Sequence, residues 1–257
     1  MQILWSVYSA IGWVFFGITT LIMLIHTRIA FLLRPDLPRE LVFYRVAGTW
    51  GMLWARSIGI RIHRHPNNKK YLKRGQSTVL VANHICFLDL HSISYGIRVP
   101  FRALSKIENS KIPVFGYFIK PAIVTVDRKS ARDRLASLDR MKDLVERGVS
   151  VLVFPEGTRN PKHDNPLGPR FYDGAFRIAV QQQIPVAPVI ISGGRTCMPG
   201  GSFQLRPGRI DVEVLEPIPT EGLTLDDVQE LRKKLYAVME EGVRARDKHF
   251  AGVKSAE

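Results

Sequence analysis

The stretch that decides the fold is Ser77–Asp89, which reads STVLVANHICFLD. Its first part, Ser77–Ala82, is a compact apolar run rich in β-branched residues, as is typical of a strand buried on both faces of a parallel sheet. Asn83 and His84 follow directly, and in α/β proteins binding sites lie at the carboxyl ends of strands. The stretch therefore predicts a buried strand that places a polar cluster at the edge of a sheet.

The same kind of run recurs along the chain. Further strands are predicted at Ala122–Val126, Ser150–Phe154, Ile184–Ser192 and Gly208–Leu215. Prolines favour an edge or a bulge for the third of these, and strict alternation makes the fourth a half-buried strand near the sheet edge.

Helical patterns separate these strands. We expect an amphipathic helix at Ser130–Glu146 that ends at Gly148, a shorter one at Ala175–Gln182, and a last one from Leu225 to about Arg246 capped by Thr224. Alternating strands and helices predict an α/β fold with a central, mostly parallel sheet flanked by helices.

The charge of the chain is large and unevenly placed. Its 257 residues carry 37 Lys and Arg against 23 Asp and Glu, a net charge of +14. The segment Met1–Ile25 has no charged side chain, whereas Arg28–Arg74 holds eleven basic and two acidic residues. A basic protein can bind nucleic acid or an anionic membrane, and an uncharged segment followed by a basic belt favours the membrane.

The amino-terminal segment is long enough to enter a bilayer. As a helix, Met1–Ile25 would reach about 37 Å, against a hydrocarbon core of about 30 Å. A second apolar stretch, Leu41–Ile60, is interrupted by arginines and suits a helix that lies in the interface. A full transmembrane helix and a two-helix hairpin within one leaflet both remain open. We expect residues 1–60 to anchor the chain and residues 61–257 to form the α/β domain on the cytoplasmic face.

Two motifs follow predicted strands. His84 and Asp89 can form a pair if the histidine sits in the turn and the aspartate on the next helix, because on one continuous helix they would point about 140° apart. Such a carboxylate orients the imidazole and stabilises its protonated form. The second motif, Phe154–Arg159 (FPEGTR), joins a carboxylate, a glycine, a hydroxyl and an arginine suited to a phosphate.

Weaker signals complete the set. Asp127 and Arg128 end another strand, where a surface ion pair would be the ordinary interpretation, and Ile184–Val189 (IPVAPV) would ordinarily belong to the core. Cys86 and Cys197 form no CxxC pattern, so we expect no metal site.

Together, and in this order, the motifs NHxxxxD, Gly116–Arg128 (with G-x-F-I and V-D-R), FPEGTR and IPVAPV resemble the glycerolipid acyltransferase family. Within it, the chain is most similar to the bacterial 1-acylglycerol-3-phosphate acyltransferases. The resemblance covers about residues 60–217. It implies a membrane-bound enzyme of phospholipid synthesis in the bacterial inner membrane. The reaction moves a fatty acyl group from acyl-CoA or acyl carrier protein to the sn-2 hydroxyl of lysophosphatidic acid.

The resemblance also implies roles for individual residues. His84 would be the general base of the HxxxxD motif and Asp89 its orienting partner. Ile184, Pro185 and Val186 would help to form an acyl channel. The donor is a co-substrate, so no cofactor is expected. The acceptor would be bound by a set with its arginines on the phosphate: Arg128, Glu156, Gly157, Thr158 and Arg159.

One departure keeps alternatives open. Asp173 stands before Gly174-Ala175, where many relatives have a lysine. The same chemistry could therefore serve another acceptor, such as lyso-ornithine lipid or glycerol 3-phosphate. A membrane-tethered basic binding module without catalysis is a remoter alternative, and nucleic acid is not expected as a partner.

Overall fold

A seven-stranded sheet forms the centre of the protein. The computed structural model describes residues 2–37, 39–97, 99–110, 120–127, 129–160 and 165–250. The strand order is β1-β7-β6-β2-β5-β3-β4, and every neighbouring pair is parallel except β6 with β7. The strands are β1 (Ile60–Arg64), β2 (Val79–Ala82), β3 (Phe101–Lys106), β4 (Ile123–Val126), β5 (Ser150–Val153), β6 (Val186–Ser192) and β7 (Gly208–Val214).

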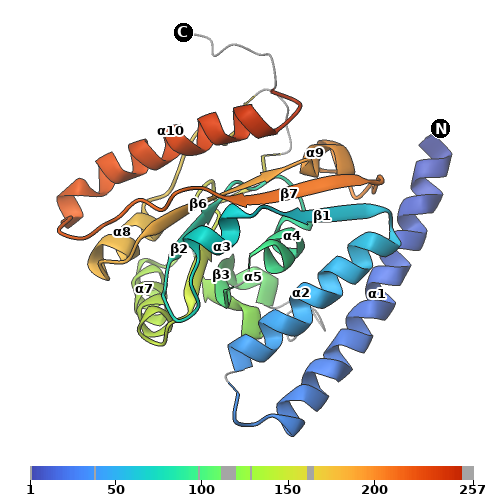
Figure 1. The fold of residues 1–257 in the computed structure, drawn as a ribbon, viewed down its shortest axis with the longest axis horizontal. Helices are drawn as coiled ribbons and strands as arrows, with labels where there is room; N and C mark the ends of the chain where they lie inside the picture. Colours follow the sequence, from blue (N-terminus) through green and yellow to red (C-terminus); the bar gives the residue numbers. More distant parts are fainter. Residues whose placement is uncertain are drawn as a thin grey trace.

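Helices cover both faces of the sheet (Figure 1). One side carries α1 (Gln2–Leu33), α2 (Arg39–Ser57) and α4 (Leu88–Gly96), and the other carries α7 (Ala131–Glu146), α8 (Gly174–Gln181) and α10 (Val228–Arg246). The short helices are α3 (Asn67–Tyr71), α5 (Ile107–Ser110), α9 (Gly194–Cys197), η1 (Lys120–Ala122), η2 (Pro199–Gly201) and η3 (Leu225–Asp227). The predicted α/β class with a mostly parallel sheet is confirmed.

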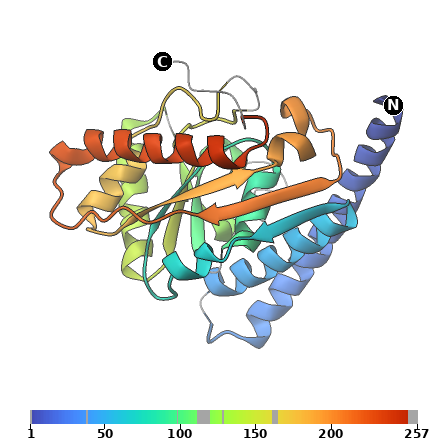
Figure 2. The ribbon, with the colours of Figure 1, turned by 45° about the horizontal axis from the view of Figure 1, so that its top comes forward.

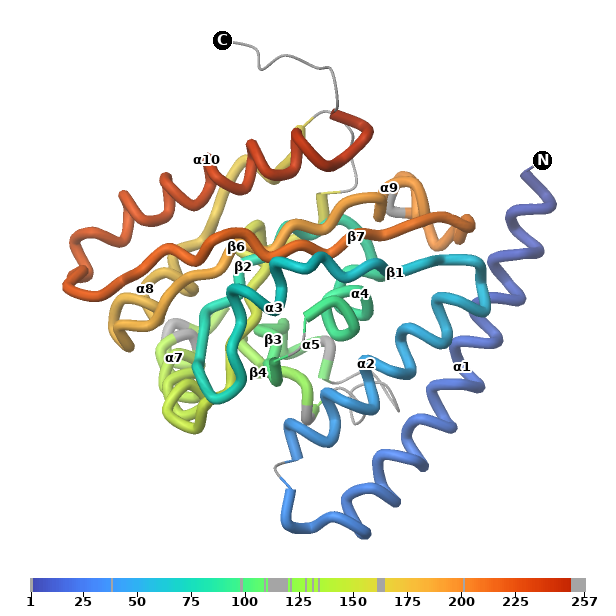
Figure 3. The backbone as a smooth tube through the Cα atoms, viewed as in Figure 1, coloured from blue at the N-terminus to red at the C-terminus, as the bar shows by residue number. Residues whose placement is uncertain are grey.

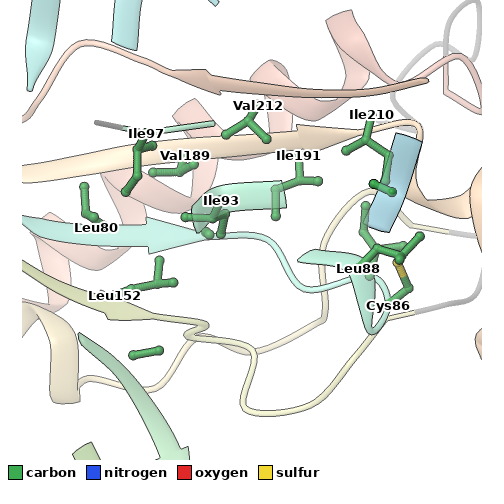
Figure 4. Close-up of a cluster of buried hydrophobic side chains, with 14 of the residues drawn as sticks. Leu80, Cys86, Leu88, Ile93, Ile97, Leu152, Val189, Ile191, Ile210 and Val212 are labelled. Atoms are coloured by element: carbon green, nitrogen blue, oxygen red, sulfur yellow. The ribbon is translucent and has the colours of Figure 1, made fainter. Parts of the chain in front are cut away.

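The central strand β2 explains why the core has two halves. All four of its residues are buried, and successive side chains point to opposite faces. Leu80 and Ala82 join the cluster beneath α2 and α4, while Val79 and Val81 join the cluster beneath α7, α8 and α10. Figure 4 shows the first cluster, with side chains that include Leu80, Ile93, Val189 and Val212. Every position of β2 therefore needs an apolar residue, because both faces of this strand lie in the core.

The position of β6 corrects an expectation. Its prolines predicted an edge strand or a bulge, but β6 lies between β2 and β7 in the sheet. An isolated bridge joins Val186 to Ile218, and the antiparallel ladder with β7 begins at Val189. Pro188 stands between these two points, where the missing N–H group breaks no pairing with β7.

Two strands had no clear sequence signal. β1 and β3 are interrupted by basic residues such as Arg61 and Arg102, so their apolar runs are too short to predict a strand. Both form because the neighbouring strands β7, β5 and β4 supply ladders for them. With β1 at the sheet edge, β7 becomes the second strand from that edge.

Helix α7 forms where the sequence predicted an amphipathic helix. Ser130 caps it, its hydroxyl accepting a hydrogen bond from the Asp133 N–H at 3.1 Å. Met141, Leu144 and Val145 are buried in the core, whereas Leu135 is exposed.

The first two helices form a hairpin along the body of the protein (Figures 2 and 3). Trp54 of α2 donates a hydrogen bond to the Gly12 carbonyl of α1 and packs into the same core as the sheet. α1 also meets the chain near β7, because the Leu205 N–H donates to the Ser9 hydroxyl at 2.8 Å. Helix α2 ends at Ser57 and strand β1 begins at Ile60. The division into an anchoring part and an α/β domain at residue 60 stays a prediction.

Among the described residues, α1 is the one helix long and apolar enough to cross a membrane. It has 32 residues, and an 18-residue window within it has a mean hydropathy of 1.9 and is only 17% buried. Its outward face carries isoleucines at a seven-residue spacing, Ile11, Ile18 and Ile25, each more than half exposed. Such a stripe is typical of a helix that faces lipid or another apolar partner.

A close helix crossing supplies a test of this packing. A methyl group on Gly48 of α2 would lie 2.7 Å from the Ser94 carbonyl oxygen of α4, whereas one on Gly17 of α1 would meet nothing within 4 Å. We expect Gly48→Ala to lower the free energy of unfolding by about 1–3 kcal/mol through overpacking. Gly17→Ala should be neutral or stabilising, since alanine is the better helix former. Thermal unfolding in detergent measures both, and equal melting temperatures would contradict this packing.

Candidate active site

The candidate site lies where β2 and β5 end side by side. The two strands are parallel neighbours, with Val81 opposite Val153. The segment Asn83–Phe87 follows β2, and Phe154–Asn160 follows β5. Both sequence motifs are therefore brought to the same edge of the sheet, as expected for the carboxyl ends of parallel strands.

Asn83 sets the position of the histidine that follows it. Its side-chain amide donates to the Ile191 carbonyl at 2.9 Å, and its amide oxygen accepts from the Ile191 N–H at 2.8 Å. The buried side chain thus replaces a backbone pair between the chain after β2 and strand β6. This pairing ends the strand and turns His84 out of the ladder.

His84 and Asp89 form the predicted pair. His84 lies in the turn, Asp89 lies in the first turn of α4, and 2.8 Å separates Nδ1 from the carboxylate Oδ2. The same oxygen accepts the backbone N–H groups of Ile85, at 2.6 Å, and Cys86, at 2.9 Å. Because the carboxylate only accepts, Nδ1 carries the proton and Nε2 is left with the lone pair. The imidazole can therefore take up a proton at Nε2.

The ring is held on a second side by Phe154. The two rings stack with centroids 4.1 Å apart, and 22% of the histidine side chain is exposed, against 1% of the aspartate. A buried carboxylate behind a partly exposed imidazole is the arrangement of a general base. The distance between the nitrogen and the oxygen does not by itself identify such a pair. His63 Nδ1 and Asp211 Oδ1 are also 2.8 Å apart near the sheet edge, where both side chains are more than a third exposed.

Glu156 lies beneath the site and contacts its backbone. Its Oε1 accepts the His84 N–H at 2.8 Å, and its Oε2 accepts the Gly168 N–H at 2.6 Å. Burial raises the pKa of Glu156 to about 7, although the two N–H bonds and His84 favour its charged form. Both carboxylate oxygens are thus engaged with the protein, and Glu156 acts here as a crosslink between two loops. The sequence motif placed this residue in the acceptor-binding set and did not indicate the crosslink.

The rest of the FPEGTR motif turns outward. Gly157 has a positive φ of 71°, a conformation that glycine adopts without strain. Thr158 and Arg159 are exposed, at the same strand end as His84. Asn160 then returns to the site, where its N–H donates to the His84 carbonyl at 2.7 Å. The structure therefore brings Glu156–Arg159 together with the histidine, and it adds Asn160, which lies just beyond the motif.

Two other predicted groups are not seen at this site. Arg128 is outside the described residues, and β4, which precedes it, is separated from β2 by β5 and β3. Ile184, Pro185 and Val186 lie at the amino end of β6, whereas His84 follows the carboxyl end of its parallel partner β2. The expectation of an acyl channel there needs correction, because Val186 is fully buried in the core on the α8 and α10 side.

An apolar cavity does occur on the other face, behind the dyad. It has a volume of about 70 Å³ between α1, α2, α4 and β3, and its lining includes Phe16, Phe43, Leu90 and Phe101. His91 also lines it, and burial lowers the pKa of His91 to about 4. The imidazole is therefore neutral near pH 7, and the cavity can accept an uncharged hydrocarbon group. The sequence pattern indicated no cavity here, because its walls come from several separate elements, among them η1 with Ala122.

Comparison with known proteins identifies the family that the chain resembles. The sequence model of the acyltransferase family matches residues 63–192, about half of the chain. A 1-acyl-sn-glycerol-3-phosphate acyltransferase of Chlamydomonas reinhardtii is 36% identical over 55% of this chain and 42% of its own length. The human 1-acyl-sn-glycerol-3-phosphate acyltransferase alpha is 32% identical over 69% of this chain and 62% of its own. The chain thus spans about two fifths to two thirds of the length of these relatives.

The fold also matches a solved structure. The 1-acyl-sn-glycerophosphate acyltransferase PlsC of Thermotoga maritima superposes with a TM-score of 0.72 over 99% of this chain and 98% of that one, at 23% identity. The chain thus has a three-layer α/β fold with a histidine–aspartate pair formed by the turn after β2 and the first turn of α4. The chain belongs to the acyltransferase family.

The raised pKa of Glu156 predicts how stability varies with pH. Between pH 4.5 and about 7 the unfolded chain ionises this carboxyl while the folded protein retains its proton. The free energy of unfolding should therefore fall as pH rises through this window, by on the order of 3 kcal/mol at 1.36 kcal/mol per pKa unit. Glu156→Gln, which cannot ionise, should remove this part of the slope.

The matched control is Glu216→Gln, which changes an exposed carboxyl just after β7. It should keep the wild-type dependence of melting temperature on pH. If the Glu156→Gln protein showed the same slope as wild type between pH 4.5 and 7, the carboxyl would not be held protonated by burial.

Proposed function

We propose that this chain transfers a fatty acyl group from acyl-CoA or acyl carrier protein to the sn-2 hydroxyl of lysophosphatidic acid, giving phosphatidic acid. The observation that carries the proposal is the His84–Asp89 pair, with Nδ1 bound to a buried carboxylate and Nε2 left to accept a proton. Membership of the acyltransferase family and the activities of the relatives support the reaction and the acceptor.

In the proposed mechanism, His84 Nε2 takes the proton of the acceptor hydroxyl as its oxygen attacks the thioester carbonyl of the donor. A carbon–oxygen bond forms, the carbon–sulfur bond breaks, and the departing thiolate recovers the proton from the imidazolium. Asp89 keeps the ring in the correct tautomer and stabilises the imidazolium. Such positioned proton transfer contributes about 10²–10⁴-fold to a rate.

Direct attack by the acceptor hydroxyl is favoured over an acyl-enzyme on Cys86. This thiol is buried, and its Sγ lies 3.5 Å from the Asp89 carboxylate. Burial, followed by the nearby aspartate, raises the pKa of Cys86 well above its usual value. A thiol that resists ionisation is a poor nucleophile.

The acceptor phosphate would be bound by Arg159. The motif resemblance assigns the same role to Arg128, which lies outside the described residues. Arg159 is exposed on the loop that also carries Glu156 and Asn160, so its guanidinium can meet a lipid headgroup from solution. A guanidinium binds phosphate through two parallel hydrogen bonds. Asp173, which left other acceptors open, is paired with Arg232 at 2.8 Å. The pair offsets the negative charge of Asp173, which supports a phosphate-bearing acceptor.

The apolar cavity behind α4, at about 70 Å³, would take only a short part of a fatty chain. Leu90 and His91 line it and follow Asp89 directly along the helix. The cavity is bounded by α1 and α2, and α1 carries most of the exposed large hydrophobic side chains among the described residues. A chain held in the bilayer could therefore reach the dyad without crossing water.

We also propose that α1 and α2 lie along one leaflet. The buried residues of α1 run from Ser9 to Thr27, about 27 Å of helix. Near one end Ser9 bonds to Leu205, and toward the other Met23 packs with Ile123 of β4. The α/β body thus flanks a length close to the hydrocarbon thickness of about 30 Å. A perpendicular span would draw the polar body into the bilayer, so the hairpin arrangement is favoured.

The proposed reaction makes His84 and Asp89 indispensable. We expect His84→Ala and Asp89→Asn each to lower kcat for acyl transfer to lysophosphatidic acid by about 10²–10⁴-fold. The control is His63→Ala, which removes the exposed pair of the same length on β1 and should leave kcat unchanged. Release of free thiol from acyl-CoA measures the rate. Full activity in the His84→Ala protein would refute the mechanism.

The same assay distinguishes the acceptors. Lysophosphatidic acid, lyso-ornithine lipid and glycerol 3-phosphate are offered in turn to the wild-type protein with one acyl donor. The proposal expects the highest kcat/KM with lysophosphatidic acid. A preference for either of the others would keep the chemistry and replace the acceptor, and no transfer to any of them would favour a binding module.

The apolar stripe of α1 yields a second test. We expect Ile18→Glu to weaken co-sedimentation with vesicles that contain anionic lipid, because the charge would enter the apolar part of the interface. Leu135→Glu is the matched control, since Leu135 is an aliphatic residue on α7, across the sheet, and is more exposed than Ile18. Equal binding by the two variants would contradict the proposed membrane face.

A further inference from the structure

A fully buried ion pair lies outside the dyad and joins distant parts of the chain. Arg195 of α9 donates from Nη1 to Asp247 Oδ2 at 2.8 Å, and the two side chains are 0% and 1% exposed. Asp247 follows the last residue of α10, so the pair fastens the end of that helix to α9 (Figures 1 and 2). The Phe250 ring covers the guanidinium at 5.0 Å.

The other end of the guanidinium reaches the loop that follows FPEGTR. Its Nη2 lies 3.4 Å from the Asn160 carbonyl oxygen and 3.3 Å from the Pro166 carbonyl oxygen. One cation thus holds two carbonyl groups that are six residues apart in sequence. A buried guanidinium is costly to desolvate unless a partner neutralises it, and Asp247 is that partner.

This loop in turn holds the backbone of His84 on both sides. The Asn160 N–H donates to the His84 carbonyl at 2.7 Å. The His84 N–H donates to Glu156, whose other oxygen accepts the N–H of Gly168, two residues after Pro166. Both the N–H and the C=O group of His84 are therefore hydrogen-bonded to the segment whose carbonyl groups Arg195 contacts.

From these contacts we infer that Arg195 and Asp247 are positioning residues for His84, through which the carboxyl-terminal end of α10 controls the placement of the general base and of the loop with Arg159. The inference rests on the proposed function for its effect on rate. Its structural part, the restraint of the His84 backbone, stands on the hydrogen bonds alone.

The test removes the hydrogen bonds of Arg195 to the loop without leaving a buried charge unpaired. In the double variant Arg195→Met/Asp247→Leu both charges are replaced by apolar side chains, a change that folded proteins often tolerate. The carbonyls of Asn160 and Pro166 lose their donor in this variant. The matched control is Arg244→Met/Glu240→Leu, which removes an ion pair of 2.9 Å from α10 itself.

Two quantities are measured in each protein. Hydrogen–deuterium exchange of the backbone amides of residues 84–86 and 160 should be at least tenfold faster in the Arg195/Asp247 double variant and unchanged in the control. The kcat for lysophosphatidic acid should fall by about 10- to 100-fold, the scale for a misplaced catalytic group, with KM for the acyl donor unchanged. A merely structural pair would instead alter kcat only in proportion to the folded fraction.

Wild-type exchange and wild-type kcat in the double variant would overturn the inference. If that variant does not fold, Arg195→Lys takes its place, because an ammonium can still neutralise Asp247 but cannot span both carbonyls. The exchange prediction for this variant is the same. Failure of the proposed function would show as an inactive wild-type protein, while exchange would still decide whether the pair restrains His84.

Discussion

The site depends on one buried carboxylate that joins two loops. Glu156 accepts N–H groups from His84 and Gly168, so the end of β2 and the segment after β5 cannot move independently. An unpaired N–H group in this low-dielectric environment would cost free energy. The crosslink avoids this cost at both N–H groups that Glu156 accepts. The dyad, the exposed arginine loop and the Arg195–Asp247 pair are all arranged around this crosslink.

A second carboxylate, that of Asp89, orients the imidazole ring of His84. Asp89 gathers the His84 ring and two backbone N–H groups on a single oxygen. Its place in the first turn of α4 is favourable for a negative charge. Burial separates this pair from His63 and Asp211, which have the same spacing at the exposed sheet edge. Distance and burial together, rather than distance alone, define the catalytic candidate.

The distribution of apolar surface relates the site to a membrane. α1 and α2 cover the face of the sheet that carries the cavity, while α10 covers the opposite face (Figure 3). The basic belt Arg28–Arg74 begins near the end of α1 and runs through α2 and β1. Under the proposed function, a lipid acceptor would thus approach from the face covered by α1 and α2.

The sequence by itself determined the α/β class, the central strand β2 and the two motifs, because unbroken apolar runs and adjacent polar residues are local signals. It also predicted the His84–Asp89 pair, since five residues and one turn bring them together. Only the tertiary structure decided that β6 is central, that Ile184–Val186 lies away from the dyad, and that Glu156 and Arg195 support His84. Those features arise from strand order and from contacts between residues far apart in the chain, which no local pattern encodes.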